Sequence, residues 1–366
     1  MTRRMRSWLL LLAWAALTRA IVLATAAVVH LTHWPRHYYP DEIAHHVFGA
    51  LGAWDSGWYS MVATRGYLLV PGRQSDPAFF PLYPVVLRLL HEAGLPLLVA
   101  ELLVSNLVFF LAIVAFVELG KLVVGEDVAR ASAILAAAFP AGFVFSMAYP
   151  EGLLFAALCV ALICALRGRW MTSAFVGGIA ALTRPEAVLY VIPIAAIVRK
   201  RWRALAPEAR VKAVASITAP VASLATFPLY LGWALHNVYA WTWAQRGWGR
   251  SFKVFGVVHA VTGLGQIGNQ AWQIRDVVFA LIYLALLGLA WRAGLDWSWV
   301  LAGLLIVLLP LTSGSVISDA RFGLMALPVY WGLGAVARRP RVLWGLAALS
   351  LVLLAAGTMT IPLTHP

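Results

Sequence analysis

A succession of long apolar runs extends along this chain of 366 residues and constrains its fold more than any other feature. Hydrophobic residues make up 62% of the sequence and charged residues only 12%, whereas soluble domains average roughly 25% charged. This composition excludes an ordinary soluble enzyme, a disordered chain and a nucleic-acid-binding domain. The formal net charge of +13 is instead typical of a membrane protein with basic cytoplasmic loops.

The first apolar run covers residues 8–31 and follows Arg3, Arg4 and Arg6. It is longer than the core of a cleaved signal peptide, which has about 7–15 residues. At a rise of about 1.5 Å per residue it can cross the hydrocarbon layer. We therefore predict an uncleaved first membrane helix, with the N-terminus in the cytoplasm.

Eleven apolar segments are predicted in total, two of them short. After the first, they cover residues 97–119, 131–148, 152–166, 172–182, 187–198, 213–235, 277–291, 297–311, 322–336 and 342–361. When these segments alternate from a cytoplasmic start, the N-terminus and the cytoplasmic loops hold 17 of the 28 Lys and Arg residues. The fold class expected is therefore an all-α polytopic membrane protein in one domain, residues 1–366.

The two short segments, 172–182 and 187–198, meet at Arg184, Pro185 and Glu186. Proline ends a helix, and non-helical backbone at membrane depth needs protein or a hydrated cavity around it. A broken hairpin that lines an internal cavity fits this pattern. Two ordinary tilted helices joined by a surface loop are the alternative.

Two long stretches, 34–96 and 236–276, lie on the non-cytoplasmic side in this topology, and we call them the first and second external loops. Both are rich in Trp, Tyr and Pro, as expected of segments at headgroup depth. In the first loop, apolar residues recur with helical spacing at positions 47, 51, 54, 58 and 61. We therefore expect an interfacial helix within 41–66 that carries Asp55 beside its apolar stripe, with Tyr59 one turn later. By itself this pattern fits a solvated carboxylate on a helix surface better than a catalytic one, because most Asp residues are solvated in this way.

Several ionisable residues stand at the non-cytoplasmic ends of apolar runs, where charges are costly and often functional. They are Glu151, Arg184, Glu186, Asp319 and Arg321. Each is compatible with a structural ion pair or with a ligand. Together they suggest a site for an anionic, lipid-linked substrate, because the planar guanidinium suits phosphate. Arg19, inside the first segment, is expected to pair or to snorkel.

Motifs for metal or nucleotide binding are missing from the sequence. It has no Gly-rich phosphate loop, no HExxH, no CxxC and no Asp-x-Asp pair. The adjacent His45 and His46 would face different directions on a helix. We expect no metal site and no cofactor.

The motifs in their order resemble the PIG-V family, the mannosyltransferase members of the GT-C membrane glycosyltransferases. The matching segments are 54–59 (WDSGWY), 66–67 (GY), 79–84 (FFPLYP), 140–155, 183–186 (TRPE), 318–322 (SDARF) and Pro328. The resemblance runs from about residue 19 to 330. The family pattern is departed from in three places. Pro150 stands where Ser is usual, Pro185-Glu186 where small or amide residues are usual, and Phe322 where Tyr is usual.

The resemblance implies a GT-C fold and an inverting transfer of mannose from polyprenyl-phosphate-mannose to a glycolipid or glycan acceptor, on the outer face of the cell membrane. Asp55 then matches the catalytic carboxylate, and Arg321 and Arg184 are candidates for binding the donor phosphate. The remaining candidates shape the sugar or acceptor pocket: Trp54, Trp58, Tyr59, Tyr67, Glu151 and Asp319. Asp41 and Glu42 compete with Asp55 for the role of base.

Three other functions remain compatible with the sequence. A polytopic transporter or lipid flippase also has broken helices and charges within the membrane, although no internal repeat is visible here. An enzyme like O-antigen ligase or oligosaccharyltransferase is the second, and an assembly partner of another synthase is the third. Only a transferase turns over polyprenyl-phosphate-mannose.

Overall fold

The structure is a computed structural model that describes residues 3–33, 45–262 and 271–361. Its described part is built from helices, without strands. The helices are α1 (Arg3–His33), α3 (Ser56–Arg65), α4 (Leu82–Glu92), α5 (Leu97–Val123), α6 (Glu126–Ala137), α7 (Glu151–Leu166), α8 (Trp170–Thr183), α9 (Val191–Arg201), α10 (Pro207–Ala234), α11 (Ala240–Gly247), α12 (Gly256–Thr262), α13 (Ala271–Arg292), α14 (Trp297–Leu311), α15 (Asp319–Phe322), α16 (Leu327–Val336) and α17 (Pro340–Met359). The predicted all-α polytopic architecture is confirmed.

Five helices in the described ranges are long and apolar enough to cross a membrane. They are Met5–Thr32, Leu97–Val123, Pro207–Ala234, Gln273–Arg292 and Pro340–Met359. Other predicted segments form shorter apolar helices of 10–17 residues, among them α7, α8, α14 and α16. The total of eleven spans therefore stays a prediction, although each segment coincides at least in part with a helix.

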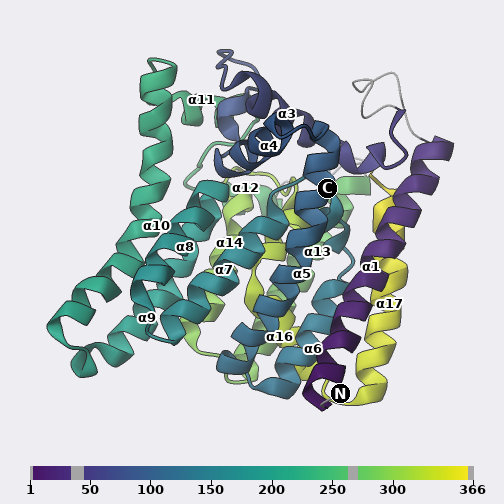
Figure 1. Ribbon diagram of the computed structural model, residues 1–366, viewed down its shortest axis with the longest axis vertical. Helices are drawn as coiled ribbons and strands as arrows, with labels where there is room; N and C mark the ends of the chain where they lie inside the picture. The colour runs from purple at the N-terminus through teal and green to yellow at the C-terminus, as the bar shows by residue number, and fades with distance from the viewer. Residues whose placement is uncertain (1–2, 34–44, 263–270, 362–366) are drawn as a thin grey trace.

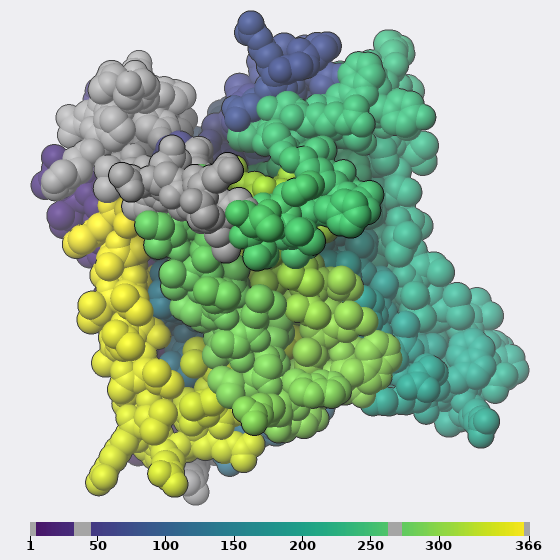
Figure 2. All heavy atoms as spheres, turned by 180° about the vertical axis from the view of Figure 1, so that it is seen from behind, coloured from purple at the N-terminus to yellow at the C-terminus, as the bar shows by residue number. Residues whose placement is uncertain are grey.

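The bundle has two distinct ends (Figure 1). The N-terminus lies at the lower end, together with the short connections between α5 and α6 and between α16 and α17. The helices of the two external loops, α3, α4, α11 and α12, lie at the upper end. Seen from behind, the green residues of the second loop lie across that end (Figure 2). The loops predicted to be external thus gather at one end of the bundle.

The third apolar segment ends earlier than the sequence predicts. The apolar run 131–148 was expected as one helix, but α6 ends at Ala137 and a 3-10 turn follows over Gly142–Ser146. Pro140 interrupts the run, because proline supplies no N–H for a continuing helix. The prediction of one continuous segment is therefore wrong.

Arg19 in α1 stabilises this break. Its guanidinium donates to the carbonyl oxygens of Gly142 (2.8 Å) and Ala137 (3.1 Å) and to Ser146 Oγ (3.1 Å). Helix ends leave carbonyl groups without partners, and a cation at a C-terminus compensates them. Arg19 was expected to pair or to snorkel. It does not snorkel, because it is only 3% exposed, and it pairs with backbone carbonyl groups and Ser146.

Small residues allow the helices to pack closely, as is common in membrane proteins. A Cβ at Gly332 in α16 would stand 2.1 Å from the Leu286 carbonyl oxygen in α13. A Cβ at Gly178 in α8 would stand 2.6 Å from Ser223 Oγ in α10. These close approaches hold α16 against α13 and α8 against α10, and Arg184 follows directly at the end of α8.

Candidate functional site

Asp55 lies in the first external loop, but the single interfacial helix predicted around it is wrong. The chain forms a 3-10 turn at Gly49–Gly52 and then a separate helix, α3, with Asp55 at its N-cap position. An aspartate there ordinarily accepts a bond from the first helical turn. Here its side chain makes no such bond. The Asp55 carboxylate is instead paired with Arg321, as described below. Residues 41–44, part of the predicted helix, and with them Asp41 and Glu42, lie outside the described residues.

The residue before Asp55 explains the interruption. Trp54 has a φ of 63°, a left-handed conformation that costs a bulky residue of the order of 1–3 kcal/mol. Its indole N–H donates to the Ile361 carbonyl oxygen at 2.8 Å. On either side, the Tyr149 hydroxyl donates to the Ala53 carbonyl oxygen and accepts from the Asp55 N–H, both at 3.2 Å. Contacts distant in the sequence thus hold the backbone in a strained turn that aims Asp55.

Helix α3 is also anchored to helix α5 by hydrogen bonds. Ser56 and Ser60, one turn apart, donate to the two carboxylate oxygens of buried Glu101 in α5 at 2.8 and 2.9 Å. Hydrogen bonds to a charged acceptor are stronger than neutral ones. The first turn of α3, and Asp55 with it, is therefore fixed to a membrane helix.

Asp55 belongs to a network of ion pairs that joins four parts of the chain. Asp55 Oδ2 pairs with an Nη atom of Arg321. The Arg321 Nε and an Nη of Arg184 both donate to the same Glu151 oxygen. Arg184 Nε also lies 2.5 Å from Glu186 Oε1. Four of the predicted site residues, Asp55, Glu151, Arg184 and Arg321, are therefore brought together.

Local structure explains how these side chains converge. Glu151 is the first residue of α7, which begins directly after Pro150. Arg184 is extended between α8 and the 3-10 helix Pro185–Tyr190, because the residue before a proline avoids helical angles. Arg321 lies in the single turn of α15 and covers the Tyr149 ring, 4.1 Å from its centroid. Each residue stands where a helix begins or ends.

Burial differs sharply across the network. The side chain of Glu151 is fully buried, whereas that of Asp55 is 16% exposed. Burial acts to raise the pKa of Asp55, but the positive charges of Arg321, Arg250 and Arg184 outweigh it and lower that pKa. Asp55 is therefore an ionised carboxylate that remains accessible from the upper end of the bundle.

The aromatic candidates occupy different places. The Trp58 ring is partly exposed, stacks on Phe79 (centroids 5.9 Å apart) and meets the edge of Trp248. Tyr59 is buried, and the charges of Arg321, Glu151 and Asp55 act on its hydroxyl, whose pKa burial raises. Tyr67 instead packs against Phe227 of α10. Trp58 and Tyr59 thus adjoin the network, whereas Tyr67 braces α10 against the first loop.

Asp319 is buried next to the network without joining it. Its two oxygens have no hydrogen-bond partner among the described residues. Arg321, two positions away in the sequence, pairs with Asp55 and Glu151 and not with Asp319. The neighbouring Asp276 accepts from the Ser318 N–H at 2.8 Å and pairs with Arg275 at 3.2 Å. Burial, with the charge of Asp276, raises the pKa of Asp319 to about 8.

This pKa predicts a pH-dependent stability. Folded Asp319 holds a proton that an unfolded aspartate, with a pKa of about 3.9, releases. The resulting stability is complete below pH ~4 and is lost as the pH rises through about 8. We expect Asp319→Asn to have a Tm roughly 2–5 °C above the unmodified protein at pH 9, a gap that shrinks at pH 5. Melting curves in one detergent at pH 5, 7 and 9 measure this gap, and a constant gap would contradict the prediction.

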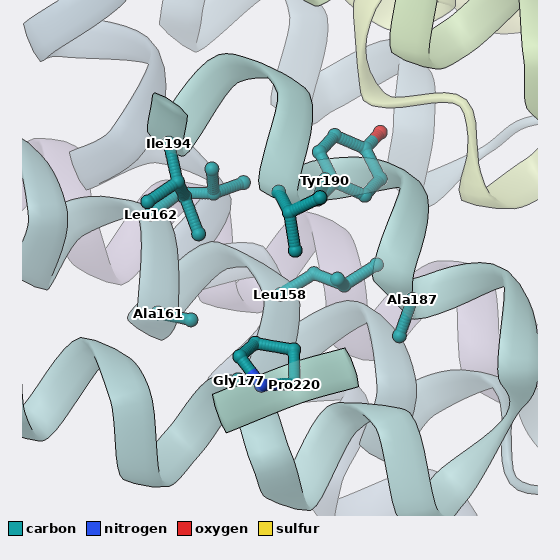
Figure 3. A pocket seen from close by; sticks show the side chains of 9 residues that line it. Leu158, Ala161, Leu162, Gly177, Ala187, Tyr190, Ile194 and Pro220 are labelled. Carbon is teal, nitrogen blue, oxygen red and sulfur yellow. The ribbon is translucent and has the colours of Figure 1, made fainter. Parts of the chain in front are cut away.

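The broken hairpin expected at 172–198 lines an apolar pocket (Figure 3). Gly177 of α8 and Ala187, Tyr190 and Ile194 of the second arm face Leu158 of α7 and Pro220 of α10. Arg184 and Glu186, at the junction, are buried. The junction is therefore not a surface loop. The Tyr190 hydroxyl donates to the Met325 carbonyl oxygen at 2.8 Å.

Sequence analysis missed Arg250 and Trp248 in the second loop. Both reach the site only because this loop folds against the first: Trp248 Nε1 donates to the Ser75 carbonyl oxygen at 3.2 Å. The sequence offered one signal, an arginine within an aromatic stretch of an external loop. Among the described residues, no three His, Cys, Asp or Glu side chains gather as metal ligands would.

The fold can now be compared with known proteins. Among solved structures the chain is similar to ArnT from Cupriavidus metallidurans bound to undecaprenyl phosphate, with a TM-score of 0.54 and 16% identity. The match covers 94% of this chain and 64% of that one, so the present chain spans less than two thirds of that length. A search of curated proteins found no match.

The helical bundle, with charged residues and interfacial helices at one end, defines an integral membrane protein of the GT-C glycosyltransferase architecture. Residues 4–295 match the sequence profile described as Mannosyltransferase (PIG-V). The chain belongs to this family of glycosyltransferases, which confirms the resemblance found in the sequence motifs.

Proposed function

We propose that the chain is an inverting mannosyltransferase that moves mannose from polyprenyl-phosphate-mannose to a lipid-linked or envelope glycan acceptor. One observation carries the proposal. Asp55 is the most exposed carboxylate of a network that otherwise consists of buried charges, and an arginine directly contacts it. A base and a cation side by side suit a reaction in which a hydroxyl loses a proton and a phosphate leaves.

The reaction needs one displacement. The acceptor oxygen attacks the anomeric carbon from the face opposite the phosphate, its proton passes to Asp55, and the bond from the anomeric carbon to the phosphate oxygen breaks. The electron pair of that bond leaves with the polyprenyl phosphate. Inversion follows, because bond making and bond breaking occur on opposite faces. The polyprenyl phosphate can leave without being protonated if positively charged side chains stabilise its negative charge. One carboxylate, acting as the base, is therefore sufficient.

Arg321 connects the base to the leaving group in this mechanism. In the structure it contacts Asp55 and Glu151. A carboxylate held by a guanidinium is a weak base, and it becomes stronger when a phosphate draws that guanidinium away. Donor binding would therefore activate Asp55 through Arg321. Arg184, tied to the same Glu151 oxygen, adds a second positive charge.

The site is proposed to face the outside of the cell membrane, with the N-terminus in the cytoplasm. Two features support this orientation. The basic connections lie at the opposite end of the bundle from α3, α4 and α11 (Figure 1), and cytoplasmic loops are enriched in Lys and Arg. The aromatic loops then lie at headgroup depth, where a polyprenyl phosphate presents its sugar.

Transfer by the purified protein tests the function. We expect radiolabelled mannose to move from polyprenyl-phosphate-mannose to a glycolipid extract of the cell envelope, in detergent and without nucleotide sugar. Heat-denatured protein is the control. If the protein moves the intact labelled lipid between the leaflets of proteoliposomes without cleaving it, the transporter alternative is correct and the proposal is wrong.

A further inference from the structure

A third arginine, Arg250, lies at the charged site. It follows α11 on the second loop, and its guanidinium lies 5.4 Å from the centroid of the Phe322 ring. Arg184 covers the same ring at 4.5 Å. Phe322 directly follows Arg321. Two arginines that are distant in the sequence, Arg184 and Arg250, therefore share one aromatic ring, and Arg321 is the residue next to it in the chain.

Arg250 differs from the other two in its partners. Arg184 and Arg321 each contact two carboxylates. Within the described ranges, no carboxylate oxygen lies within 4 Å of the Arg250 side-chain nitrogens. Its charge nevertheless acts on Asp55, whose pKa it helps to lower. Arg250 is partly buried, and burial together with Arg321 and Arg184 lowers its own pKa. A cation in such a place favours an anionic ligand.

The formal charge of the ion-pair network also favours an anionic ligand at Arg250. Asp55, Glu151 and Glu186 oppose only Arg184 and Arg321 in the ion-pair network, which leaves a formal charge of −1. A negatively charged phosphate would be repelled by such a group of residues. Arg250 makes the site formally neutral before the ligand binds, and it does so with donors that no described carboxylate occupies.

The backbone holds Arg250 in place on both sides. Before it, Gln245 Nε2 donates to the Ala78 carbonyl oxygen at 3.2 Å, and a Cβ on Gly247 would stand only 2.1 Å from the Arg73 carbonyl oxygen. After it, the Lys253 N–H donates to the Thr312 carbonyl oxygen at 2.9 Å. The segment thus joins the first loop to the end of α14 and carries Arg250 across the site.

We propose that Arg250 is a further residue that binds the phosphate of the polyprenyl donor and the first to contact it, because Arg184 and Arg321 are held by carboxylates until the donor binds. This inference rests on the proposed transferase function. The planar guanidinium donates two parallel hydrogen bonds to phosphate oxygens, which an ammonium cannot do. The Phe322 ring, whose centroid lies 5.4 Å from the Arg250 guanidinium, adds a cation–π contact that helps to hold Arg250 at the site.

The test compares Arg250→Gln with Arg246→Gln, which removes the same charge from an exposed position in α11. Affinity for undecaprenyl phosphate is measured in phosphatidylcholine nanodiscs, and the KM for the mannosyl donor is measured beside it. We expect Arg250→Gln to weaken both by at least about tenfold, since hydrogen bonds to charged groups are strong. Arg246→Gln should stay within about twofold, and Arg250→Lys should recover only part of the loss.

Two further readouts separate a ligand role from a structural role. The Tm without ligand should not fall in Arg250→Gln, because no described carboxylate loses its partner; a fall of several degrees would indicate a structural arginine. Phosphatidic acid in place of undecaprenyl phosphate should bind at least about tenfold more weakly. Equal binding that depends equally on Arg250 would identify a general lipid-phosphate site and overturn the donor assignment.

Failure of the inference and failure of the function give different results. If the unmodified protein transfers mannose and Arg250→Gln binds undecaprenyl phosphate with unchanged affinity, the role of Arg250 is wrong and the transferase function stands. If the unmodified protein neither binds undecaprenyl phosphate nor transfers mannose, both are wrong.

Discussion

Asp55→Asn is expected to lower mannose transfer by 10²–10⁴-fold, about 3–5 kcal/mol, while the protein stays folded. Asparagine keeps the size of the side chain and one oxygen for Arg321, but it cannot accept a proton. The strained turn at Trp54 is held by Tyr149 and Ile361 and not by the Asp55 carboxylate. Single-turnover transfer and the Tm, measured on the same preparation, check both statements.

Glu92→Gln is the matched control, because it makes the same chemical change on an exposed turn of α4, where Arg88 is the ion-pair partner of Glu92 among the described residues. It should transfer mannose at the normal rate. Asp41→Asn and Glu42→Gln complete the set, since both residues precede α3 in the same loop. Normal turnover in Asp55→Asn, with collapse in either of these two, would assign the base elsewhere.

Glu151→Gln is expected to destabilise the protein by about 3–5 kcal/mol, the usual effect of removing one partner from a buried ion pair. The Glu151 side chain is fully buried and accepts from both Arg321 and Arg184 through one oxygen. When the residue at position 151 is neutral, Asp55 and Glu186 are the remaining described carboxylates that compensate the buried guanidinium groups of Arg184 and Arg321. At roughly 2 cal/mol/K of unfolding entropy per residue, the Tm should fall by about 4–7 °C. Transfer should also fall, because Arg321 loses the partner that positions it.

Glu118→Gln serves as the comparison for Glu151. Glu118 also has two basic partners, Lys121 at 2.7 Å and Arg167 at 3.6 Å, but its side chain is 29% exposed. Exposed ion pairs contribute only about 0–1 kcal/mol, so the Tm should change by no more than a degree or two. Equal Tm values for the two variants would show that burial does not determine the strength of the site.

Much of the architecture followed from local patterns in the sequence. Runs of apolar residues predicted helices at nearly the correct positions, as α5, α7 and α14 show. Hydrophobicity is a property of each residue by itself, so the partition between membrane and water can be read along the chain. The breaks were less predictable. Pro185 correctly marked the junction of the hairpin. The end of α6 at Ala137 was missed although Pro140 follows it, and the break is stabilised by Arg19, more than a hundred positions away.

In the candidate site, too, local features could be predicted from the sequence and long-range contacts could not. The types of residue were visible: the carboxylate Asp55 in a family motif, and Glu151, Arg184 and Arg321 at the ends of apolar runs. The pairs were not visible. Asp319 stands two positions from Arg321, yet Arg321 pairs with Asp55 and Glu151, which are 266 and 170 positions away. Arg250 had one signal in the sequence, its place in an aromatic stretch of the second external loop, and nothing there indicated which residues it would meet.

The sequence by itself determined that this chain is a helical membrane protein with ionisable residues at the ends of its apolar runs, because transfer free energies act residue by residue. Only the tertiary structure decided which charges meet. An ion pair depends on the distance between two side chains, and in a low-dielectric interior a few ångströms separate a compensated charge from a costly one. The strained turn at Trp54 is the clearest case: local periodicity predicted a continuous helix, but Tyr149 and Ile361 hold the backbone open and aim Asp55 at Arg321.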